Sequence, residues 1–77
     1  MNCVQAAIKS ANKEENGGQG YDLLLTLENG ATIEGTPHHP ETAGDGYLEI
    51  HVGEDAETAA EVFVEVKRVV CATIIWG

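Results

Sequence analysis

The sequence has little of what marks secreted, membrane-spanning or catalytic proteins. Its two cysteines, Cys3 and Cys71, lie at opposite ends and outside any CxxC pair, which predicts a reduced, cytoplasmic chain without disulfides. No stretch of the sequence has the pattern of a secretory leader, and no apolar run approaches the ~20 residues that a membrane-spanning helix needs, so we expect neither a leader nor a membrane partner. The sequence also lacks a Gly-x-Ser-x-Gly elbow, a phosphate-binding loop and a dinucleotide-binding fingerprint, and we therefore expect no enzyme.

Basic side chains are scarce as well. Four Lys and Arg residues stand against thirteen Asp and Glu residues, and the formal net charge at pH 7 is -9. Nucleic-acid affinity comes largely from basic side chains that displace counterions, so this charge disfavours RNA and DNA as partners. Two interpretations of the acidity stay open: it keeps the protein soluble, or it attracts a basic protein partner.

A short helix is predicted over residues 1–16. Ala7 and Ile8 follow Val4 at spacings of three and four residues, which places these side chains on one stripe of a helix. Asn2 can cap the start of this helix, and the Asn-Gly-Gly at residues 16–18 is a typical stop signal. Because a helix this short is unstable alone, we expect its apolar stripe to pack on the rest of the chain.

The rest of the chain has the pattern of short strands. Asn29-Gly30 between two alternating runs is a strong hairpin signal, and Gly35 inside the return strand suggests a bulge or sharp bend. The sequence therefore predicts a mainly β fold in which the helix precedes a five-stranded, strongly bent antiparallel sheet or small barrel over residues 21–76. The predicted strands are residues 21–28, 31–36, 47–52, 61–67 and 69–76.

The last predicted strand, residues 69–76, is apolar on both faces. Such strands are normally buried on both sides, and a single domain of residues 1–77 has too little material to cover both. We therefore expect a homo-oligomer in which part of this strand contacts another subunit. Phe63 falls on the polar side of its strand, where it is either an exposed platform or a subunit contact. The candidate interface comprises Phe63, Val69, Val70, Ile74 and Trp76.

The side chains that could bind a metal or take part in catalysis are explained by their structural surroundings alone. Adjacent histidines on an extended chain point apart, so we expect a solvated loop at residues 37–46, without a metal or any other cofactor. Cys71 lies between apolar neighbours, where we expect it to be buried and inert. The carboxylates that alternate with apolar residues, Glu49, Glu61 and Glu65, are expected on a solvated sheet face. The metal-capable set comprises His38, His39, Glu41, Asp45 and His51.

Two segments are similar to motifs of a known family. LLLTLENGATIEG, residues 23–35, looks like the first Sm motif: an alternating strand, a turn ending in glycine, and a hydrophobic residue two positions before a second glycine. FVEVKRVVCATII, residues 63–75, is similar to the closing strand pair of the same fold. With the order of the elements, these segments resemble the Sm-like (LSm/Hfq-type) small β-barrel family, which implies a ring-forming barrel that binds single-stranded RNA.

The resemblance implies RNA contacts at Lys67 and Arg68, a basic pair between the last two strands. The family's base-holding Asp-x-x-Met-Asn segment has no counterpart after Gly35, and the Arg-Gly of the second Sm motif is missing. Two functions therefore stay open. The chain is either a ring-forming Sm-like module that binds single-stranded RNA weakly, or an acidic oligomeric module for protein interaction or assembly that binds no nucleic acid.

Overall fold

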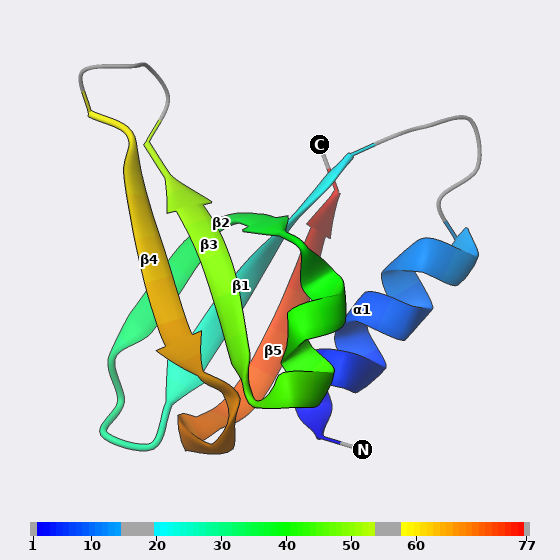
Figure 1. Ribbon diagram of the computed structural model, residues 1–77, viewed down its shortest axis with the longest axis horizontal. Coiled ribbons are helices and arrows are strands. Elements are labelled where there is room, and N and C mark those ends of the chain that lie inside the picture. The colour runs from blue at the N-terminus through cyan, green and yellow to red at the C-terminus, as the bar shows by residue number, and fades with distance from the viewer. Residues whose placement is uncertain (1, 15–19, 54–57, 77) are drawn as a thin grey trace.

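The computed structural model describes residues 2–14, 20–53 and 58–76 (Figure 1). The fold is mainly β, with one short N-terminal helix before five strands, as the sequence predicts. Helix α1 spans Cys3–Glu14, and two short 3-10 helices are η1 (Pro40–Asp45) and η2 (Val66–Arg68). The strands are β1 (Tyr21–Leu27), β2 (Thr32–His38), β3 (Tyr47–Val52), β4 (Ala60–Glu65) and β5 (Val69–Trp76).

The five strands form one antiparallel sheet in the order β4-β3-β2-β1-β5. Of the two predicted architectures, the bent sheet is found and the closed barrel is not, because β4 and β5 lie at opposite ends of this order. Figure 1 shows the ribbons of β4 and β5 diverging from the short connection that joins them. Each of these two strands therefore has one neighbour within the described sheet and one free edge.

Strand β2 changes its partner at Gly35, where the sequence predicts a bend. Residues 32–35 pair with β1, whereas residues 36–38 pair with β3. A Cβ atom on Gly35 would lie 2.5 Å from the carbonyl oxygen of His51 and 2.6 Å from Cγ2 of Ile50. Both separations are shorter than any carbon can tolerate, so β3 passes too close to Gly35 for a side chain to fit.

The hairpin between β1 and β2 forms at Asn29 and Gly30, as predicted. Gly30 has a φ of 89°, which lies in the left-handed region that glycine enters without a steric penalty. The side-chain Oδ1 of Asn29 accepts a hydrogen bond of 2.9 Å from the backbone N–H of Ala31. Asn29 therefore contributes through its side chain, and the left-handed residue of this turn is the glycine.

Helix α1 begins at the predicted cap. The Oδ1 atom of Asn2 accepts a hydrogen bond of 2.9 Å from the backbone N–H of Gln5, which satisfies one of the free donors of the first turn. The predicted stop signal at residues 16–18 lies outside the described residues. No helix in the described ranges is long and apolar enough to cross a bilayer, and α1 itself has 12 residues.

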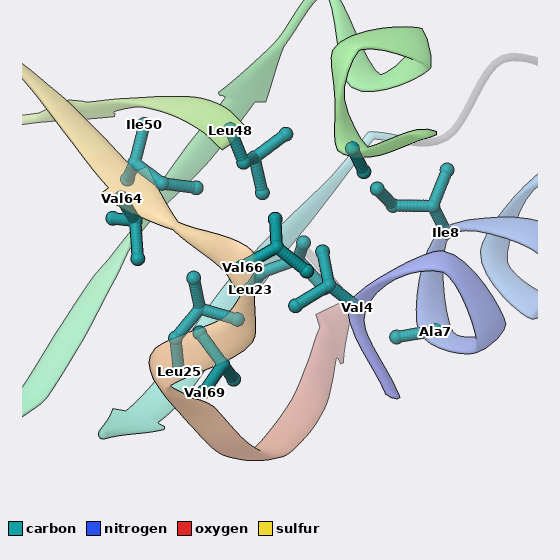
Figure 2. Packing of buried hydrophobic residues seen from close by; sticks show 11 residues of the cluster. Val4, Ala7, Ile8, Leu23, Leu25, Leu48, Ile50, Val64, Val66 and Val69 are labelled. Carbon is teal, nitrogen blue, oxygen red and sulfur yellow. The ribbon is translucent and has the colours of Figure 1, made fainter. Parts of the chain in front are cut away.

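The core lies between α1 and the inner face of the sheet, by which we mean the face that carries Leu23, Leu25, Leu48 and Ile50. These four side chains are fully buried, and Val4 of α1 is buried with them (Figure 2). Alternation along each strand sends the intervening residues to the opposite, outer face. The other members of the buried cluster are Ala7, Ile8, Ala43, Val64, Val66 and Val69.

The segment predicted as a solvated loop, residues 37–46, is mostly structured. Strand β2 continues to His38, and η1 then occupies Pro40–Asp45. Pro40 is tolerated at the start of η1 because a first-turn N–H has no partner within a helix. Ala43 is 3% exposed and belongs to the core, so η1 closes one end of the core instead of projecting into solvent.

Candidate functional site

Large apolar side chains stay exposed on both edge strands. Phe63 on β4 exposes 62% of its surface, and Val70 and Trp76 on β5 expose 63% and 39%. Unpaired strand edges offer free backbone N–H and C=O groups to another chain, and soluble proteins normally protect them with charge or cover them. Here exposed apolar side chains accompany the two free edges, which makes the edges candidate contact surfaces.

Val70 is exposed because β5 has an irregularity at this point. Cys71 pairs with Thr26 and Val69 pairs with Leu27, so consecutive residues of β1 face β5 residues that are two apart. Val70 is the extra residue between them, as in a β-bulge, and its side chain is turned away from the core. The sequence gives no sign of this bulge.

Three of the predicted interface residues have contacts inside the subunit. The ring centroid of Trp76 lies 5.9 Å from that of Tyr21. Val69 is 8% exposed and belongs to the core, and its carbonyl oxygen accepts a hydrogen bond from the Cys3 thiol at 3.6 Å. Ile74 pairs with the buried Leu23 and packs against the same core. Helix α1, which packs on β5, therefore covers part of the apolar surface that we expected a second subunit to cover.

A shallow pocket of about 290 Å³ runs beside β4. Phe63 forms part of its wall, and the half-buried Leu27 and Ile33 of the β1–β2 hairpin contribute further apolar surface. This pocket gives the β4 edge an apolar hollow, whereas Val70 gives the β5 edge an apolar projection. The full lining is Leu27, Ile33, Phe63, Val64, Glu65 and Arg68.

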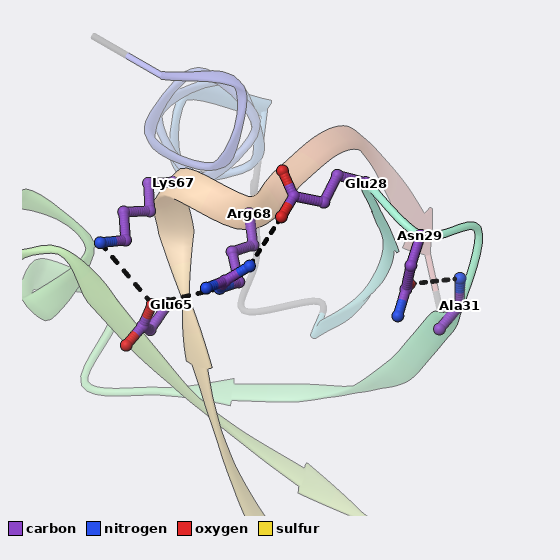
Figure 3. Close-up of polar contacts among 6 residues, drawn as sticks. All are labelled: Glu28, Asn29, Ala31, Glu65, Lys67 and Arg68. Atoms are coloured by element: carbon purple, nitrogen blue, oxygen red, sulfur yellow. Dashed lines mark hydrogen bonds and ion pairs between the residues drawn. The ribbon is translucent and has the colours of Figure 1, made fainter.

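The predicted RNA contacts, Lys67 and Arg68, lie on η2 at the junction of β4 and β5 and are paired with carboxylates (Figure 3). The Nη1 atom of Arg68 lies 2.7 Å from Oε1 of Glu28, and its Nε atom lies 3.4 Å from Oε2 of Glu65. The Nζ atom of Lys67 lies 4.0 Å from the same Glu65 oxygen. Two acidic side chains therefore offset the two basic ones, and the turn is not a free positive patch.

The structure brings together a histidine cluster of His38, Glu49 and His51, of which we expected only the two histidines to be metal-capable. The rings of His38 and His51 stack with centroids 3.6 Å apart and an interplanar angle of 8°. The Nε2 atom of His51 is hydrogen-bonded to the Oε2 atom of Glu49. His39 is not a member of this group, because its Nδ1 atom lies 3.7 Å from Oε1 of Glu41. Its ring nevertheless meets that of His38 edge-on, with centroids 6.0 Å apart, so the two adjacent histidines do not simply point apart as we expected.

Glu49 is the member of this cluster that the sequence pattern did not lead us to expect. We expected Glu49 on a solvated sheet face with Glu61 and Glu65, but its side chain is only 18% exposed whereas Glu61 and Glu65 are exposed. The alternation along β3 could have indicated that Glu49 and His51 share one face. Its pairing with His38 depends on the register between β2 and β3, which no local pattern specifies.

The two cysteines are both free. Cys71 is exposed, contrary to the expectation of a buried thiol, because it follows the bulge at Val70 and shares the outer face with Thr26. Cys3 is half-buried against β5. Neither thiol lies in the histidine cluster, so the cluster's ligand atoms are imidazole nitrogens and a carboxylate oxygen.

Comparison of the chain with models of protein families, with curated proteins and with solved structures found no match. The geometry of the edges, the basic turn and the histidine cluster is therefore the basis for assigning a function.

Proposed function

We propose that this protein is an Sm-like assembly module that forms a homo-oligomeric ring by joining strand β4 of one subunit to strand β5 of the next. The observation that supports it most directly is the open sheet, whose two free edges carry the exposed Phe63, Val70 and Trp76. Antiparallel sheets are extended by adding a strand at such an edge, because main-chain hydrogen bonds form without further change in either chain.

The difference between the two edges favours a head-to-tail contact. The β4 edge has an apolar hollow beside Phe63, and the β5 edge has the projecting Val70. A contact between unlike surfaces repeats from subunit to subunit and closes into a ring when the rotation permits. Full burial of one large apolar side chain contributes roughly 1.5–3 kcal/mol, so a few such side chains at each contact stabilise the assembly substantially.

The acidic charge favours a basic protein segment over RNA as the partner of the assembled module. RNA binding has one supporting feature, the placement of Lys67 and Arg68 on the same turn. Phosphate would have to displace Glu28 and Glu65 from these two side chains, and the formal net charge of -9 repels it at long range. We therefore infer that RNA binding, if it occurs at low salt, is weak and secondary to assembly.

Light scattering at tens of micromolar tests the assembly. We expect the wild-type mass to be a multiple of the 8.2 kDa subunit. Phe63→Lys and Val70→Lys should each lower that mass while the far-ultraviolet circular dichroism stays unchanged, because both side chains are exposed and their removal leaves the core intact.

Tyr47→Lys is the matched control. Tyr47 is 43% exposed, comparable to the edge residues, but it lies on β3, which β2 and β4 flank on both sides. This variant should keep the wild-type mass. A monomeric wild type would overturn the proposal, and so would a Tyr47→Lys variant that dissociates as readily as Phe63→Lys. A dimer whose mass depends on only one of the two edges would replace the ring with a two-fold contact between like edges.

A further inference from the structure

We propose that His38, Glu49 and His51 form a binding site for a divalent transition-metal ion such as Zn²⁺ on the outer face of the sheet. His38 lies directly opposite Glu49 in the register between β2 and β3, and His51 follows Glu49 by two residues on β3. All three side chains therefore project from the same face of two hydrogen-bonded strands. These strands are interior to the sheet, and none of the three residues belongs to the contact proposed for assembly, although Phe63 of that contact lies opposite Glu49.

The distances suit one ion. A ligand atom from each of the three side chains lies within 4.8 Å of the other two. In a tetrahedral site with bonds of about 2.0–2.2 Å, the ligand atoms lie roughly 3.4 Å apart. The stacked imidazoles of His38 and His51 have to tilt so that one nitrogen of each points to a common centre. The proposal requires this tilt to come from rotation of the exposed His38 ring and the half-buried His51 ring about their side-chain torsions.

The ligand types select a particular class of metal. Two imidazole nitrogens and one carboxylate oxygen make the His₂Glu set found in zinc sites that keep a position open for water. Imidazole suits Zn²⁺, Cu²⁺ and Ni²⁺, whereas Mg²⁺ and Ca²⁺ prefer sites made of oxygen ligands. The exposed Glu61 lies opposite His51 in the register between β3 and β4 and adds negative charge beside the site.

Burial supports an ordered site with an open entrance. The side chains of Glu49 and His51 are 18% and 33% exposed, so the surrounding strands restrict their conformations. Their mutual hydrogen bond already directs an oxygen of Glu49 toward the imidazole of His51. His38 is exposed and leaves the third position accessible to an ion from solvent. A bound metal ion would take the place of the hydrogen bond between Glu49 and His51.

Titration of the tag-free protein with Co²⁺, followed by displacement with Zn²⁺, tests this site. We expect the visible absorption of a four- or five-coordinate Co²⁺ complex, which Zn²⁺ removes and excess Mg²⁺ does not. Loss of outer-shell groups alone weakens metal sites by about 10–100-fold, so His38→Ala, Glu49→Gln and His51→Ala should each weaken Zn²⁺ binding at least tenfold by calorimetry.

The matched control is His39→Ala, which removes an adjacent histidine that lies outside the cluster. This variant should bind Zn²⁺ like the wild type, and all four variants should keep the wild-type mass in light scattering. The proposal is overturned if Co²⁺ gives no visible absorption band, or if His38→Ala and His51→Ala bind Zn²⁺ as tightly as the wild type. In either case the cluster serves only as packing between β2 and β3.

Discussion

The bent sheet has two halves that meet at Gly35, and a different helix packs against each. The first half consists of β5, β1 and residues 32–35 of β2, and α1 packs on β5. The second half consists of residues 36–38 of β2, β3 and β4, and η1 packs on β3. Both halves contribute to one core, since Leu23 of the first and Ile50 of the second belong to the same buried cluster.

The two halves differ in how regularly successive side chains alternate between the inner and outer faces of the sheet. In the second half, the outer face carries His38, Glu49 and the exposed Phe63 in one cross-strand row. In the first half, the bulge at Val70 interrupts the alternation, so an apolar residue is exposed at the edge. Regular pairing therefore produced the candidate metal site, whereas irregular pairing produced the candidate contact on β5.

The largest loss of stability is expected from adding a side chain at Gly35, where the two halves meet. Gly35→Val should reduce the free energy of unfolding by about 3 kcal/mol or more, because its Cβ atom would collide with the backbone of His51. Ala31→Val, at an exposed position in the hairpin, should change it by no more than about 0.5 kcal/mol. Thermal unfolding of both variants should give midpoints that differ by more than about 10 °C. Equal midpoints would show that the two halves do not need this close approach.

A second pair of variants distinguishes the role of the inner face of β5 in folding from the role of its edge in assembly. Ile74→Lys should unfold the protein or cost about 2 kcal/mol or more, because the charge would replace an apolar side chain that packs on the core. Val70→Lys should leave the unfolding of the subunit nearly unchanged and lower only the mass of the assembly. Circular dichroism together with light scattering distinguishes the two outcomes. If both variants simply unfold, Val70 is part of the core and the edge assignment is wrong.

The turn that joins the two edges allows a test of RNA binding. Glu28→Gln combined with Glu65→Gln removes the carboxylates that pair with Lys67 and Arg68, and it should increase affinity for short single-stranded RNA several-fold. The dependence of log affinity on log salt should steepen by roughly 0.7 for each phosphate contact that the freed side chains make.

A control with the same change in net charge is Glu34→Gln combined with Glu41→Gln, at two exposed positions away from that turn. This control should bind RNA no better than the wild type. An equal gain in both double variants would mean that total charge sets the affinity and that the position of the basic pair is irrelevant.

The smallest change in the free energy of unfolding is expected at the hairpin between β1 and β2, in the first half. Asn29→Ala removes the hydrogen bond that the side chain accepts from the N–H of Ala31 and should cost about 0.5–1 kcal/mol, because this bond is exposed to water. Asn29→Asp keeps an acceptor oxygen in the same place and should lose less stability than Asn29→Ala. Chemical denaturation measures both differences. An alanine variant as stable as the wild type would mean that Gly30 alone determines the turn.

Local patterns in the sequence determined most of the elements. Alternation predicts residues 47–52, and a run of β-branched residues that is apolar on both faces predicts residues 69–76. These ranges are the bounds of β3 and β5, and Asn29-Gly30 locates the hairpin correctly. These features are predictable because a strand, a turn and a helix cap each depend on residues within a few positions of one another. Asn2 illustrates the same point, since its capping partner Gln5 is three residues away.

Only the tertiary structure decided which distant residues meet. Ala43 makes η1 part of the core, and Arg68 pairs with Glu28 across 40 positions of sequence, so neither contact follows from a local pattern. The same holds for His38, which reaches Glu49 and His51 only because β2 changes partner at Gly35 and enters a defined register with β3. Cross-strand register depends on burial of the whole inner face, and a shift of one residue would send all of these side chains to the opposite face.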